Sequence, residues 1–143
     1  MAWLSNLPTW LFPNVVIWAG LLIKFLEKLG YGITNNGWKE VPEATKFYHG
    51  LSLTVGSEAR GMGLGKELIK RTLKIGKEKD CSHCYILASS IYSQRIFKDL
   101  GFQVLHEEAY DEFHDKNGEI FFKDMREHKT CQVVLYDLNN IDF

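Results

Sequence analysis

Three glycines at alternate positions constrain the fold of this chain more than any other feature of its sequence. Gly61, Gly63 and Gly65 follow a β-forming run, Phe47 to Val55, and precede an amphipathic stretch that begins at Leu64. Glycine adopts a positive φ at little steric cost and lets the backbone approach a ligand closely. The spacing therefore predicts a tight connection from the end of a strand to the first turn of a helix.

Regular elements alternate along the rest of the chain. We expect a strand at Phe47–Val55, a helix at Leu64–Gly76, a strand at Cys84–Ala88, a helix at Ile91–Leu100, a strand from Phe102 and a last strand at Thr130–Leu138. Asn117-Gly118 predicts a tight turn between the last two strands. This order predicts an α/β fold with a mixed central sheet, parallel in its middle and antiparallel at one end, and helices on both faces.

The composition fits one domain and argues against a nucleic-acid partner. The chain has 143 residues, of which 45% are hydrophobic, which is material for a single core. Its 17 basic and 18 acidic residues leave a net charge of -1, so no summed positive charge attracts nucleic acid. Three cysteines, an odd number, fit a reducing compartment. We therefore expect a cytoplasmic protein.

An apolar run near the N-terminus predicts a helix from Val15 to Leu29, ended by Gly30. Its most apolar part, Val15–Ile23, is shorter than the roughly 20 residues that a membrane-spanning helix needs. No Lys or Arg precedes this run, and no small-residue cleavage site follows it before Lys28, unlike a signal peptide. We interpret it as a core or interface helix; a membrane-surface helix and a targeting segment are the alternatives.

The segment from Arg60 to Lys66 is the strongest candidate for a binding site. Free N–H groups at the start of a helix, together with the helix dipole, favour an anion such as pyrophosphate. Glu67 stands where a Walker loop needs Ser or Thr, and Gly65 comes one residue early for a dinucleotide-binding G-x-G-x-x-G motif. A tight turn without a ligand is the alternative interpretation.

These residues resemble a known motif. Leu51 to Gly65 (LSLTVGSEARGMGLG) resembles the acetyl-CoA-binding motif of the GNAT superfamily of N-acetyltransferases, R/Q-x-x-G-x-G/A, with Arg60, Gly63 and Gly65 at the matching positions. Ser89 to Phe102 resembles the second cofactor segment of the superfamily, which ends in Gly-Phe. The chain therefore resembles a partial or truncated GNAT fold.

Further segments are similar to insect-type arylalkylamine N-acetyltransferases. They are Ser89–Ser93 (Ser-Ser-x-Tyr-Ser), Tyr110–Phe113 (Tyr-x-x-Phe), Asp115–Phe122, His128 and the final strand. This resemblance implies transfer of an acetyl group from acetyl-CoA to the primary amine of a small arylalkylamine. The small-molecule amine and acetyl-CoA are therefore the expected partners.

The resemblance also implies which residues hold the cofactor. In the family the strand before the glycines diverges from its neighbour, and the pantetheine arm enters the gap, which implicates backbone groups at Leu53 and Val55. The pyrophosphate is expected at the amides that follow Arg60, which belong to Gly61, Met62, Gly63, Leu64, Gly65 and Lys66.

Ser89 and Ser93 match two serines that have catalytic roles in the insect-type enzymes. Ser93 is expected to assist proton delivery to the departing thiolate. The alternative is local: Ser89 or Ser90 caps the following helix, and Ser93 is a residue of its first turn. Phe97 stands where vertebrate-type relatives carry a tyrosine general acid, so that mechanism is excluded at this position.

The remaining polar candidates are weaker. Cys81-Ser82-His83-Cys84 has metal-like spacing, but a zinc site needs a second ligand pair and only Cys131 remains, so we expect no metal. His128 borders the acceptor pocket in one interpretation and is a surface or capping histidine in the other.

Residues 1–45 match no part of the N-terminal half that family members carry. We therefore divide the chain into an unmatched segment, 1–45, with one apolar helix, and a GNAT-like acetyl-CoA-binding domain, 46–143. The alternative function is a truncated, catalytically impaired GNAT-like protein that binds CoA or a partner without turnover.

Overall fold

The computed structural model describes residues 11–28, 41 and 43–143. Its helices are α1 (Leu11–Lys28), α3 (Leu64–Glu78) and α4 (Ile91–Asp99), and its strands are β1 (Phe47–Gly50), β2 (His83–Ala88), β3 (Gln103–Ala109) and β4 (Thr130–Asp137). Short 3-10 turns lie at Ser57–Ala59, Tyr110–Glu112 and Leu138–Asn140. The predicted order of strands and helices is confirmed. The predicted N-terminal helix is α1, while Leu29 lies outside the described residues.

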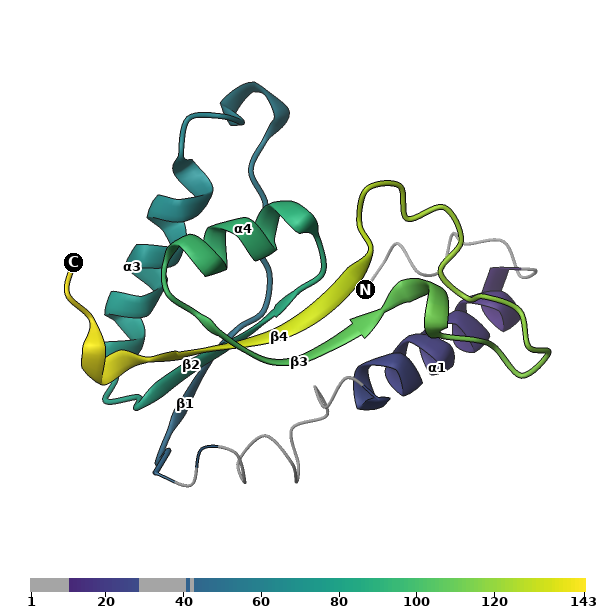
Figure 1. Cartoon of the computed structure of the whole chain (residues 1–143), viewed down its shortest axis with the longest axis horizontal. Coiled ribbons are helices and arrows are strands. Elements are labelled where there is room, and N and C mark those ends of the chain that lie inside the picture. The colour runs from purple at the N-terminus through teal and green to yellow at the C-terminus, as the bar shows by residue number, and fades with distance from the viewer. Residues whose placement is uncertain (1–10, 29–40, 42) are drawn as a thin grey trace.

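The strands form one mixed sheet in the order β1-β2-β4-β3 (Figure 1). β1 pairs parallel with β2, whereas β4 pairs antiparallel with both β2 and β3. Within the described sheet the prediction of a parallel middle is wrong, because the parallel pair lies at one end. The reason is the path after β3: the chain returns through residues 110–129 and inserts β4 between β2 and β3.

β1 is shorter than the sequence predicts, because it ends at Gly50 and not at Val55. Gly50 is the last residue in register with β2, opposite Ile86. A Cβ at Gly50 would lie 2.7 Å from Cγ1 of Ile86, so the Ile86 side chain lies across this position. Beyond it the chain leaves the sheet, and Leu51 is 84% exposed. The β-forming composition of residues 51–55 therefore does not produce strand pairing with β2.

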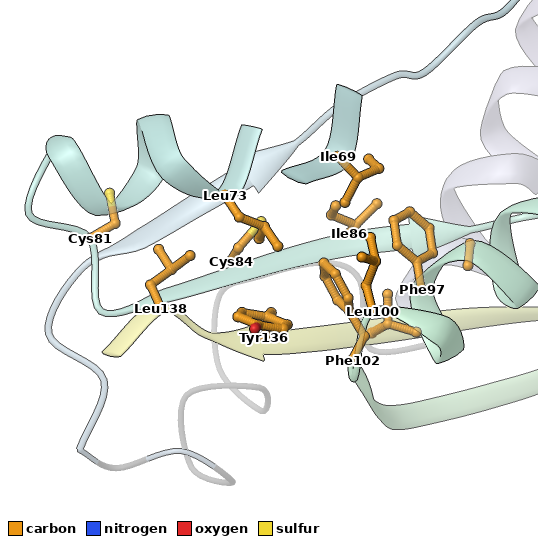
Figure 2. Close-up of a cluster of buried hydrophobic side chains, with 12 residues drawn as sticks. Ile69, Leu73, Cys81, Cys84, Ile86, Phe97, Leu100, Phe102, Tyr136 and Leu138 are labelled. Carbon is orange, nitrogen blue, oxygen red and sulfur yellow. The ribbon is translucent and has the colours of Figure 1, made fainter. Parts of the chain in front are cut away.

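One hydrophobic core lies between the sheet and the pair α3 and α4 (Figure 2). α3 buries Gly65, Ile69, Leu73 and Gly76, which recur at helical spacing along one face. The same core holds Cys84 and Ile86 of β2, Phe97 and Leu100 of α4, Phe102, Val134, Tyr136 and Leu138. Leu64 and Leu68, although apolar, are exposed, because they flank the stripe that meets the sheet.

A second core lies on the opposite face of the sheet. Successive residues of β4 point to opposite faces, so Cys131 and Val133 face this core while Val134 faces the first. Phe25 of α1 is its central residue and packs against an aromatic group formed by Tyr110, Phe113 and Phe122. Figure 1 shows α1 beside the long connection from β3 to β4. Helices therefore cover both faces, as predicted.

α1 contains the apolar run that raised the question of a membrane. Lys28 at its end forms an ion pair with Glu108 of β3, 2.7 Å from Nζ to Oε2. Across residues 11–28, 41 and 43–143, no helix combines the length and apolarity needed to cross a membrane.

Leu73 provides a test of the α3 core. Leu73→Ala removes a fully buried side chain and leaves a cavity, so we expect the free energy of unfolding to fall by about 3 kcal/mol. Ile75→Ala, on the exposed face of the same helix, is the matched control and should cost far less. Chemical denaturation of both variants measures the difference, and equal losses would contradict this packing.

Candidate functional site

The glycine loop has the backbone geometry that the sequence predicts. Gly61 has φ +78° and Gly63 has φ +75°, both in the left-handed region that favours glycine. A Cβ built on either residue meets no atom within 4 Å. Backbone conformation, and not crowding by the protein, therefore requires glycine at these positions, and the space beside the loop is open.

The loop leads directly into α3. Gly63 is the N-cap of this helix, and no side chain caps it. The first bond of the helix runs from the Glu67 N–H to the Gly63 carbonyl, 3.2 Å from N to O. The amides of Leu64, Gly65 and Lys66 precede that bond and have no carbonyl partner within the helix. Three amides and the positive end of the helix dipole therefore face the open loop, an arrangement that favours an anion.

Gly65 brings the start of α3 close to two other segments. A Cβ at this buried residue would lie 3.0 Å from Cδ1 of Ile96 in α4, and 3.9 Å from methyl carbons of Leu53 and Val55. The glycine loop, α4 and the segment that leaves the sheet after Gly50 therefore meet at one place. The sequence-predicted residues Leu53, Val55 and Gly65 are thus neighbours, although ten residues separate Val55 from Gly65.

Positive charge lies at the start of α4. Arg60 and Arg95 both act electrostatically on Tyr92, where they favour ionisation. The larger effect on Tyr92 is opposite: its hydroxyl donates to Oε1 of Glu127 at 2.8 Å, and this bond raises the pKa of Tyr92. The charges of Arg60, in the glycine loop, and of Arg95, in α4, therefore both act at the exposed Tyr92 side chain.

The serine segment forms the N-terminus of α4, and Ser90 is its cap. Ser90 Oγ accepts a hydrogen bond from the Ser93 N–H at 3.2 Å, while Ser93 Oγ accepts one from the Ser90 N–H at 3.3 Å. This is a reciprocal capping box. Ser93 Oγ also donates to the Ser90 carbonyl at 2.9 Å. Ser89 is exposed just before the cap. Of the two predicted caps the structure selects Ser90, while Ser93 also has a local structural role.

Two further side chains fix this turn, Gln94 from within α4 and Tyr110 from outside it. The Gln94 amide donates to the carbonyls of Ala88, at 3.2 Å, and Thr130, at 2.8 Å. The Tyr110 hydroxyl donates to the Ser89 carbonyl at 2.7 Å. Tyr110 is identifiable in the sequence as the first residue of the Tyr-x-x-Phe segment. No sequence pattern predicts its hydrogen bond to Ser89.

His128 contributes a third contact. Its Nδ1 accepts a hydrogen bond from the Ile91 N–H at 3.3 Å, and its ring lies edge-on to Tyr92. Of its two interpretations, this contact supports the capping histidine, although the cap is supplied from a distant segment. Phe97 lies in the hydrophobic core against Phe102, so no hydroxyl is available there.

Comparison with known proteins identifies the family. The family model described as Acetyltransferase (GNAT) family matches residues 18–102, more than half of the chain. The chain therefore belongs to the GNAT acetyltransferase family, and the resemblance drawn from its motifs is confirmed. The match begins within α1 and includes the glycine loop and both serines.

Solved structures support the same fold. Arylalkylamine N-acetyltransferase 2 from Aedes aegypti is 27% identical over 82% of this chain, with a TM-score of 0.74. The Drosophila melanogaster polyamine N-acetyltransferase, which forms N-acetylagmatine, is 19% identical over 82%, with a TM-score of 0.70. A Bacillus subtilis acetyltransferase in complex with CoA is 17% identical over 66% of this chain and 65% of its own, with a TM-score of 0.50. The chain spans about half of the two insect enzymes, 53% and 55% of their lengths.

The capping box makes a prediction about stability. Ser90→Ala removes the acceptor for the Ser93 N–H, so we expect the free energy of unfolding to fall by about 1 kcal/mol. Ser89→Ala is the matched control, because the Ser89 side chain is exposed outside the cap and its loss should leave stability unchanged. Thermal unfolding of both variants measures this, and a larger loss in the Ser89 variant would reverse the assignment.

Proposed function

We propose that this chain is an acetyl-CoA-dependent N-acetyltransferase domain that acts on the primary amine of a small arylalkylamine. Residues 46–143 form its cofactor-binding part in this proposal. The observation that carries it is the junction at Gly65. An uncapped helix start, a positive-φ loop and the segment that leaves β2 after Gly50 meet there. Because the chain belongs to the GNAT acetyltransferase family, we assign this junction to the binding of acetyl-CoA.

The residues of the loop fit the diphosphate of CoA. The amides from Gly61 to Lys66 surround space in which a Cβ at Gly61 or Gly63 would meet no atom. Arg60 directly precedes these residues in the chain, is exposed, and can supply a charged donor, and charge-assisted hydrogen bonds to phosphate are among the stronger ones. A substitution with a side chain at either glycine would both strain the backbone and occupy this space.

The pantetheine arm is assigned to the gap where β1 ends. β2 continues for two residues past Ile86, its last partner in β1, while the chain after Gly50 turns away. The main-chain groups of Leu53 and Val55 therefore have no partner in β2, and an extended chain that carries amides can pair with them. In this proposal the thioester end lies toward the β2–α4 turn, which carries Ser89 and Ser93.

The reaction needs a neutral amine, a donor for the developing oxyanion and a proton for the departing thiolate. In the proposal, Ser93 gives its hydroxyl proton to the departing thiolate and regains one from the attacking nitrogen, which carries a surplus proton in the tetrahedral intermediate. The Ser93 hydroxyl now donates to the Ser90 carbonyl, so it must rotate to serve the thiolate while its oxygen still accepts the Ser90 N–H. Ser89, whose exposed side chain lies just outside the cap, is assigned as the second polar group.

The choice of an arylalkylamine rests on the resemblance of residues 89–93 and 110–122 to insect-type enzymes, together with the 27% identity to the Aedes aegypti enzyme. The polyamine enzyme of Drosophila melanogaster has the same fold, so agmatine is the alternative acceptor to include in an amine panel.

Thiol release tests the activity. Acetyl-CoA with tyramine should yield free CoA thiol, and Arg60→Gln should weaken apparent acetyl-CoA binding about tenfold by removing one charge-assisted bond. Arg71→Gln changes an exposed arginine further along α3 that pairs with Glu67, and it is the matched control with unchanged kinetics.

A chromogenic disulfide reagent suits this assay. All three cysteines are buried, and burial raises the pKa of the Cys84 thiol to about 12 and that of Cys131 to about 11, so these two remain unreactive thiols near neutral pH. Absence of thiol release with every amine of the panel, arylalkylamines and agmatine included, would overturn the proposed activity.

CoA binding is measured separately. Free CoA at a concentration of 100 times its Kd should stabilise the fold by about 2.7 kcal/mol, seen as a rise in Tm. Gly63→Asp, which places a carboxylate and a strained φ at the helix start, should abolish that rise. Stabilisation by CoA without thiol release would support the alternative, a GNAT-like protein that binds CoA without turnover.

A further inference from the structure

Tyr110 contains a buried polar group that the proposed cofactor site does not use. It follows β3 and opens the turn Tyr110–Glu112, and its side chain is 4% exposed. Its hydroxyl donates to the Ser89 carbonyl, 21 residues earlier in the sequence, at 2.7 Å. A buried hydroxyl without such a partner would be costly, so this contact fixes where the ring and the carbonyl lie relative to each other.

The Ser89 carbonyl belongs to the peptide unit that joins Ser89 to Ser90. The N–H of the same unit donates to Ser93 Oγ at 3.3 Å. One peptide plane is therefore held at both polar ends, by Tyr110 at its oxygen and by Ser93 at its nitrogen. Any rotation of that plane moves the Ser90 N–H, which donates to the Ser93 hydroxyl oxygen.

The Tyr110 ring is held in turn by α1 and by the connection before β4. It stacks on Phe25, with centroids 5.6 Å apart and planes inclined by 23°, and it meets Phe122 edge-on at 5.0 Å. Cys131 of β4 lies beside the hydroxyl. Burial raises the pKa of Tyr110 far above its ordinary value, so the phenol keeps its proton and remains a donor.

We propose that Tyr110 is a positioning residue, which orients the Ser89–Ser90 peptide and through it the hydroxyl of Ser93. Tyr110 belongs to the core on the sheet face opposite α3, and we assign it no part in proton transfer. Because Phe25 of α1 packs on the Tyr110 ring, α1 also helps to hold Tyr110 in this position. This inference rests on the proposed function for its effect on turnover, but its structural content is independent of that function.

The kinetic test is Tyr110→Phe, which keeps the ring and removes only the hydroxyl. We expect kcat for acetyl transfer to tyramine to fall about tenfold, the effect of losing one orienting hydrogen bond. KM for acetyl-CoA should stay unchanged, because the glycine loop is untouched. Tyr136→Phe, another buried tyrosine of the sheet with its ring in the α3 core, is the matched control and should keep kcat. Equal loss in both variants would overturn the positioning role.

A second measurement does not depend on turnover. Amide hydrogen exchange followed by NMR should show the Ser90 N–H exchanging about tenfold faster in Tyr110→Phe than in the wild type, with amides at the middle of α3 unchanged. Unchanged Ser90 exchange would overturn the proposal even if kcat fell. If the wild type acetylates no amine, the proposed function fails, and this exchange experiment alone decides whether Tyr110 sets the turn.

The wild-type protein supplies a check that needs no variant. A hydroxyl proton held between Tyr110 and the Ser89 carbonyl should exchange slowly enough to be observed, with a cross-relaxation signal to the Ser90 amide. Should Tyr110→Phe fail to fold, this signal supports the proposal, and its absence overturns it.

Discussion

The candidate site depends on where the parallel ladder between β1 and β2 ends. Gly50 and Ile86 are its last pair, and the Ile86 side chain lies across the position where any other residue would carry a Cβ. Past this pair the two backbones separate, so main-chain groups that would bond to each other in a regular sheet become available to a ligand. The glycine loop then returns the chain to the sheet as α3, with its uncapped amides facing the same opening.

The sheet supports the site from two sides because β4 has residues in both cores. Val134 and Tyr136 pack under α3 and α4, which hold the glycine loop and the serine turn. Cys131 and Val133 pack toward α1 and the aromatic connection, from which Tyr110 reaches the same serine turn. The turn between β2 and α4 is thus fixed by helical capping within α4 and by hydrogen bonds from segments on the other face.

Ser93 illustrates how one residue can serve local structure and a proposed reaction. As a member of the capping box it is held by the Ser90 backbone and hydroxyl, which restrict its rotamer. In the proposed reaction the Ser93 oxygen keeps this position and only its O–H turns from the Ser90 carbonyl toward the thiolate, so little reorganisation is needed at that moment. The capping and catalytic interpretations of the sequence are therefore compatible.

The sequence alone determined the order of elements, the positive-φ glycines and the amphipathic character of α3, because these follow from local sterics and from periodicity within one segment. It also determined the family, since the glycine and serine motifs are short and contiguous. Only the tertiary structure decided where β1 stops pairing, that β4 lies between β2 and β3, and that Tyr110, Gln94 and His128 hold the serine turn. Residues 51–55 have strand composition but do not pair with β2, and Tyr110 lies 21 residues from Ser89 in the sequence. Strand pairing and long-range hydrogen bonds depend on which segments the fold brings together, and no local sequence pattern predicts this.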